Sequence, residues 1–262
     1  MSDIRDSLDK ILAVSIDSIK DEQNFLNLVL SDSPEGNILK ELAIFKDNGA
    51  LYKLIFSVYA TFEYTIKECC NTALLTIDKN SLDSLTDELQ MLTFRQKLDE
   101  LRKKIIEKRE DNTVIKPLTD LHIKIKQQTE FNSNENMIDT KSNLNFNNFT
   151  EILEIFHFDK KKYKSYSIII DSIITYRNMI AHGNRKDLTE INIRQYIPGN
   201  YKIITLHKEN NRLYFEDLCS DMINLLKLFC QYLTGYVNEQ QYLRHAKLIL
   251  FYILKKERHS KS

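Results

Sequence analysis

Hydrophobic residues recur every three or four positions along most of this chain, which is the spacing of helices that bury one face. This spacing predicts helices over residues 4–30, 51–75 and 84–110, another beginning at residue 167, and a last helix or helix pair over 216–255. Only five glycines and three prolines interrupt the pattern. The chain is therefore predicted to be all-α, a helical bundle with long N-terminal helices.

Two stretches depart from the helical pattern early in the chain and in its middle. Ser33–Gly36 contains proline and glycine and predicts a turn after the first helix. Between residues 131 and 149 the chain carries seven asparagines, a composition that disfavours helix and predicts a loop. Asn148, followed three residues later by Glu151, predicts the cap of a short helix that ends near Phe156.

A third departure follows residue 197, where Pro198-Gly199-Asn200 breaks the chain. Tyr201–Leu206 and Arg212–Phe215 flank an Asn210-Asn211 pair, which predicts a small β-hairpin inserted near residues 201–216. On this pattern we divide the chain into an N-terminal helical extension (1–40), a central helical domain (41–245), and a C-terminal helix end with a basic tail (246–262).

The most informative motif closes the isoleucine-rich helix that begins near residue 167, and reads Tyr176-Arg177-Asn178-Met179-Ile180-Ala181-His182-Gly183. Gly183 predicts a left-handed cap, which places His182 at the helix C-terminus, where the helix dipole favours a protonated ring. Arg177 falls on the apolar stripe of this helix, where a guanidinium is costly unless it meets an anion, a partner or water. Asn178 lies one turn before His182 and could orient the imidazole.

Arg177 and His182 are about 140° apart around an ideal helix. They converge only through the long arginine side chain or through a neighbouring helix, a geometry that suits a site shared between elements or subunits.

The motif resembles the R-x4-6-H signature of the HEPN superfamily, in the form RN followed by AHG, and is nearest to the MAE-like HEPN subgroup. The helix over Leu51–Glu63 resembles the first core helix of the family, and Ser142-Asn143-Leu144 resembles the approach to the helix before the motif. The resemblance spans roughly residues 40–240.

This resemblance implies a homodimer in which two copies of the motif face each other and form a metal-independent endoribonuclease site. A histidine can move a proton to or from a ribose oxygen, while an arginine holds the phosphate. Many relatives act as toxins or antiviral defence effectors, some of them held by an antitoxin or another regulatory partner. Where relatives paired with a nucleotidyltransferase carry an AMP-accepting tyrosine, this chain has Asn184.

We therefore expect Arg177 and His182 to react with single-stranded RNA, with Asn178 positioning the histidine. Supporting roles are predicted for Glu63, if the helix over 51–75 reaches the motif, and for Tyr176, whose ring could stack on a base. The alternative is a non-catalytic helical module, in which Arg177 lies at a dimer seam and His182 only caps its helix.

Charge and composition restrict the partners. The 37 basic and 37 acidic residues balance, so attraction to RNA has to be local, and the run of four lysines before the motif helix is its best candidate: Lys160, Lys161, Lys162 and Lys164. A solvated linker explains these lysines equally well.

No metal-ligand or nucleotide-binding motif is present in the sequence, so no cofactor is expected. The absence of a membrane-length apolar run and the scattered cysteines predict a cytoplasmic protein.

Overall fold

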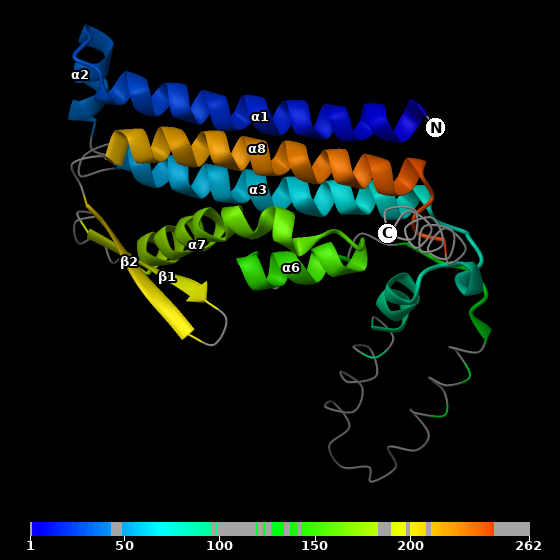
Figure 1. Ribbon diagram of the computed structural model, residues 1–262. Coiled ribbons are helices and arrows are strands. Elements are labelled where there is room, and N and C mark those ends of the chain that lie inside the picture. The colour runs from blue at the N-terminus through cyan, green and yellow to red at the C-terminus, as the bar shows by residue number, and fades with distance from the viewer. Residues whose placement is uncertain are drawn as a thin grey trace, which may run out of the picture.

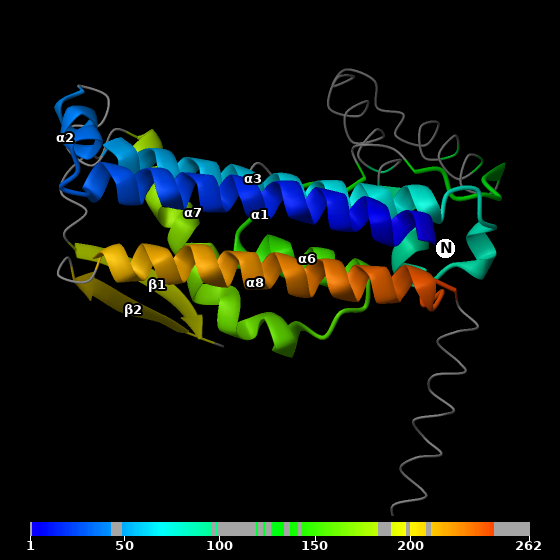
Figure 2. The ribbon, with the colours of Figure 1, turned by 90° about the horizontal axis from the view of Figure 1, so that it is seen from above.

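The computed structural model describes residues 2–42, 49–95, 98, 119, 123, 127–133, 137–140, 143–182, 190–197, 200–207 and 211–243. Three long helices form its frame and run alongside one another in two perpendicular views (Figures 1 and 2). They are α1 (Ser2–Leu30), α3 (Gly49–Thr76) and α8 (Asn211–Asn238). The apolar residues predicted to face the core from α3, among them Leu54, Val58 and Phe62, are buried. The predicted helical fold is confirmed.

A short helix, α2 (Pro34–Glu41), follows α1 where the sequence predicted only a turn. The Ser33 hydroxyl accepts a hydrogen bond from the Gly36 N–H, and Pro34 occupies the first helical position, where its missing N–H is not needed. Proline and glycine here start a helix, so the prediction of a turn alone was wrong. After α3, a single 3-10 turn at Leu82–Ser84 (η2) precedes a helical segment over residues 87–95; the rest of the predicted 84–110 helix lies outside the described residues, apart from Leu98.

Helix α6 (Phe146–Ile155) begins earlier than predicted. The Asn145 side chain accepts a hydrogen bond from the Asn148 N–H at 2.8 Å, and the Asn148 carboxamide donates to the Asn143 carbonyl. The cap is therefore Asn145 rather than Asn148, and the predicted 131–149 loop ends at residue 145. Asp171, on a neighbouring helix, accepts the Phe146 N–H at 3.0 Å and so ties the start of α6 to that helix. Burial raises the pKa of the Asp171 carboxyl, and the Phe146 N–H opposes this.

Replacing Asn145 with alanine is expected to lower the free energy of unfolding by about 1 kcal/mol, because the Asn148 N–H loses its acceptor. Urea denaturation of the two proteins measures this difference. Asn147→Ala, the same substitution at an exposed position of α6, is the matched control and should change stability by less than about 0.5 kcal/mol. Equal losses in both variants would show that Asn145 is not the cap that matters.

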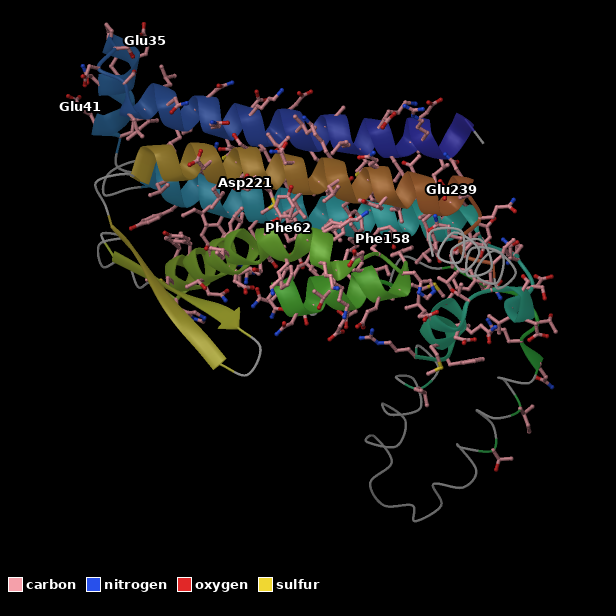
Figure 3. The ribbon with its side chains drawn as sticks, viewed as in Figure 1. Glu35, Glu41, Phe62, Phe158, Asp221 and Glu239 are labelled. Carbon is pink, nitrogen blue, oxygen red and sulfur yellow. The ribbon has the colours of Figure 1, made fainter. Side chains whose placement is uncertain are left out.

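An aromatic cluster joins α6 and the segment after it to the long helices. The Phe149 ring lies 6.0 Å from Phe62 of α3, 5.8 Å from Phe229 of α8 and 5.6 Å from Tyr163, measured between ring centroids. Figure 3 shows Phe62 and Phe158 in the layer between the long helices and α6. Tyr163 belongs to η3 (Lys160–Tyr166), a 3-10 helix that leads directly into α7 (Ser167–Ala181). This cluster fixes where α7 begins.

Two antiparallel strands follow α7, namely β1 (Glu190–Ile197) and β2 (Asn200–His207). Their register runs from Glu190 opposite His207 to Ile197 opposite Asn200. The predicted hairpin over 201–216 was therefore misplaced: its first strand is the second strand of the structure, and α8 begins at Asn211. The two strands pair upstream of the Asn210-Asn211 pair, which the prediction had taken as the turn of the hairpin.

The first helix is part of the same packing as the central helices. Helix α1 contacts both α3 and α8, and its Glu22 carboxylate pairs with Lys53 at 2.8 Å. The division between an extension at 1–40 and a domain at 41–245 stays a proposal. The four cysteines are buried, with the Cys69 and Cys230 sulfur atoms 3.4 Å apart where α3 meets α8.

Candidate active site

The motif predicted from the sequence lies at the C-terminal end of α7, which packs against α3 (Figure 1). Ile170, Ile173 and Ile174 are buried along this helix. Arg177 comes where the apolar stripe reaches the surface, and its side chain is half-buried. The periodicity predicted a cation on the apolar stripe, and the structure places it where that stripe reaches solvent.

Arg177 is held by uncharged groups. Its guanidinium carbon lies 5.1 Å from the centre of the Tyr59 ring, and its Nη1 donates a hydrogen bond to the Asn178 carboxamide oxygen at 3.0 Å. None of the ion pairs between described residues involves Arg177. Its positive charge is therefore supported by a ring and an amide and stays available to an anion.

Tyr59 connects three parts of the fold at this point. It belongs to α3, its ring contacts Arg177 of α7, and its hydroxyl oxygen accepts the Leu144 N–H at 3.0 Å from the segment before α6. The pKa of Tyr59 is raised to about 12, mainly because the phenol is buried. The Glu63 carboxylate also raises this pKa through its charge and a hydrogen bond, whereas the Leu144 N–H and the positive charge of Arg177 lower it. The phenol is neutral at physiological pH. Glu63 interacts with this phenol, and its supporting role toward the motif stays a prediction.

His182 forms the C-cap of α7. Its backbone N–H donates to the Asn178 carbonyl at 3.0 Å, and its side chain is exposed. Within the described residues no hydrogen bond joins the imidazole to Arg177 or to the Asn178 side chain, whose oxygen is engaged by Arg177. The role of Asn178 toward the histidine stays a prediction. A single chain thus offers one half-buried cation and one exposed imidazole that do not contact each other.

Comparison with known proteins bears on this arrangement. A family model described as RiboL-PSP-HEPN matches residues 15–239. The chain belongs to this HEPN family. The matched stretch contains α3, α6, α7 and α8, and so it includes every element that contributes to the motif. Among curated proteins and among solved structures, no match is found. Membership of the HEPN superfamily is confirmed, while the MAE-like subgroup stays a prediction.

The lysines proposed for RNA binding lie elsewhere in this HEPN domain. The lysines belong to η3, which ends where α7 begins at Ser167. Arg177 lies ten residues after Ser167, so about 15 Å of helix separates the start of α7 from Arg177. Lys160 pairs with Glu154, and Lys162 contacts the Tyr232 hydroxyl and lies over its ring. The other two, Lys161 and Lys164, are exposed and have no ion pair among the described residues. The lysine run and the motif are therefore separate surfaces.

The tyrosines near the motif in sequence are poor candidates for stacking on RNA bases. Tyr163 and Tyr176 are fully buried, and Tyr166 is half-buried. Tyr176 is thus part of the core beneath the HEPN motif. The tyrosine that contacts Arg177 is Tyr59, which sequence reasoning missed. The available signal was its position four residues before Glu63 on the helix that resembled the first core helix of the family.

Three other features of the described residues bear on what this HEPN chain could bind. No group of three or more histidine, cysteine, aspartate or glutamate side chains comes together there as a metal site. A hollow of about 490 Å³ lies at the far end of the long helices, lined by residues such as Ile4, Thr72 and Val237, and none of the described residues that line it is charged. No described helix has the length and hydropathy needed to span a bilayer.

Proposed function

We propose that this HEPN protein is a metal-independent endoribonuclease that cuts single-stranded RNA at a site formed across a homodimer. The observation that carries the proposal is the Arg177 guanidinium, which is half-buried, held against the Tyr59 ring and free of any carboxylate among the described residues. A structural arginine at such a depth is normally paired with an anion of its own chain. An RNA phosphate supplies that anion here.

The reaction needs only groups that the motif contains. An imidazole takes the proton of a ribose 2′-hydroxyl, O2′ attacks the adjacent phosphorus, the bond from phosphorus to O5′ breaks, and O5′ takes up a proton. The products are a 2′,3′-cyclic phosphate and a 5′-hydroxyl. His182 carries a proton in this scheme, and Arg177 stabilises the negative charge that grows on the phosphate oxygens. RNA provides the nucleophile, so neither serine nor cysteine is required.

The separation of Arg177 and His182 within one chain supports the dimeric site. Among the described residues no hydrogen bond joins their side chains, and on an ideal helix positions 177 and 182 are about 140° apart. A second copy that faces the first would bring its histidine beside the arginine of its partner. The role of a toxin or defence effector, held in check by an antitoxin or another regulatory partner, is part of the same proposal, as is the MAE-like form of the motif.

The second candidate is a non-catalytic HEPN-like module that dimerises or binds a partner. One observation favours it: among the described residues, no side chain is hydrogen-bonded to the His182 imidazole, whereas a catalytic histidine is usually oriented by a second group. In a dimeric nuclease the partner or the RNA would supply that group.

Incubation of the purified protein with end-labelled single-stranded RNA in EDTA tests the proposal. We expect cleavage that leaves 2′,3′-cyclic phosphate or its hydrolysed 3′-phosphate, because the 2′-hydroxyl is the nucleophile. A 2′-O-methyl RNA of the same sequence has no such nucleophile and should stay intact. Cleavage of the methylated RNA, or cleavage that EDTA abolishes, would contradict the mechanism. Absence of cleavage, with retained dimerisation, would favour the binding module.

A further inference from the structure

Arg177 approaches the face of a ring that is itself fixed from two sides. Tyr59 is 3% exposed, and its hydroxyl accepts the Leu144 N–H at 3.0 Å. The guanidinium carbon of Arg177 lies 5.1 Å from the ring centre. An aromatic ring that is buried and hydrogen-bonded at its tip has no freedom to turn, so its face offers a fixed platform to the cation.

The Tyr59 ring is uncharged, so its contact with Arg177 does not neutralise the guanidinium. The exposed or half-exposed lysines Lys53 and Lys160 are each paired with a glutamate of their own chain, which neutralises them. Glu63 follows Tyr59 by one turn of α3 and interacts with the phenol, and the ion pairs between described residues do not include one between Glu63 and Arg177. A neutral ring thus replaces the carboxylate that would otherwise hold the guanidinium.

We propose that Tyr59 is the positioning residue for Arg177, because its ring fixes the guanidinium by a cation–π contact and leaves the full positive charge free for the RNA phosphate. The catalytic consequence rests on the proposed nuclease function, whereas the ordering of the arginine does not. The Tyr59 hydroxyl anchors the ring through Leu144, and Asn178 fixes the guanidinium edge at Nη1.

Two substitutions separate the ring from its hydroxyl. Tyr59→Phe keeps the aromatic face and loses the hydrogen bond to Leu144, whereas Tyr59→Leu removes the face. Tyr163→Leu is the matched control, because Tyr163 is equally buried but lies at the opposite end of α7, against Phe149. Thermal unfolding of each variant establishes that the compared proteins are folded at the assay temperature.

The first measurement is the order of the Arg177 Nε–Hε group by NMR relaxation in the free protein, assigned with Arg177→Lys. We expect high order in the wild type, Tyr59→Phe and Tyr163→Leu, and a clear loss of order in Tyr59→Leu alone. The second is single-turnover cleavage of single-stranded RNA. Tyr59→Leu should slow cleavage about 30- to 100-fold, because a displaced binding group costs rates of that order. Tyr59→Phe should stay within about fivefold of the wild type.

The two readouts distinguish the possible failures. If the wild type does not cut RNA but Arg177 loses order only in Tyr59→Leu, the positioning role stands and the nuclease function falls. If the wild type cuts and Tyr59→Leu matches it in order and rate, the positioning role is wrong and the nuclease stands. Equal losses in Tyr59→Leu and Tyr163→Leu would show a general effect of core truncation and would also overturn the role of Tyr59.

Discussion

Replacing Arg177 with alanine is expected to lower the rate of RNA cleavage about a thousandfold while the protein keeps its fold and its dimer. A preorganised cation that meets the developing phosphate charge contributes about 10²- to 10³-fold or more in comparable sites. The fold should tolerate the change, because the side chain is half-buried and its contacts are one ring face and one hydrogen bond. The lost cation–π contact costs about 1 kcal/mol.

Arg177→Lys and Lys161→Ala complete this test. A lysine keeps the charge but not the planar fork that binds two phosphate oxygens, so Arg177→Lys should recover only part of the activity. Lys161, which the sequence nominated for RNA binding, is an exposed cation at the other end of α7. Its removal can weaken RNA binding, but single-turnover cleavage at saturating protein should stay within about threefold, because the lysine lies away from Arg177. Rates come from single-turnover cleavage and the oligomeric state from sedimentation. If Arg177→Ala changes the oligomeric state and leaves cleavage unchanged, Arg177 is a structural residue of the dimer interface and not a catalytic one.

The helices around the motif were predictable because their signal is local. The isoleucine spacing before Arg177 depends only on neighbouring residues, and it correctly indicated a helix with a buried face that ends near His182. The same spacing predicted that Arg177 would lie on the apolar stripe. The start of α6 was less predictable, because several asparagines compete as caps and the choice of Asn145 is supported by Asp171 from a different helix.

The support beneath Arg177 was not predictable in this way. Tyr59 and Leu144 are far from Arg177 in sequence, and only the packing of α3 and α6 against α7 brings them together. Closeness in sequence does not mean closeness in space for the lysine run, since α7 separates Lys160–Lys164 from Arg177. RNA binding by these lysines stays a prediction. Sequence patterns therefore pointed to Arg177 and His182 as candidates and missed the side chain that holds one of them.

Replacing His182 with alanine is expected to lower cleavage about 10²- to 10⁴-fold, which is the usual contribution of a positioned proton-transfer group. Stability should change by less than about 0.5 kcal/mol, because the side chain is exposed and the contact that caps α7 is made by the backbone N–H. Cleavage kinetics and thermal unfolding of the variant check both statements. If His182→Ala is unfolded at the assay temperature, so that the loss of folded protein accounts for the loss of cleavage, His182 would be a helix-capping residue and not a catalytic one.

Mixing the two inactive variants tests whether the site is shared between copies. If each site combines Arg177 of one copy with His182 of its partner, a mixed dimer of Arg177→Ala and His182→Ala contains one intact site and one doubly altered site. Random pairing makes half of the dimers mixed, so co-expression of the two variants should restore about a quarter of the wild-type activity. A site made within one chain would stay inactive in every pairing. Because Arg177 and His182 do not contact each other in the single chain, we expect restoration.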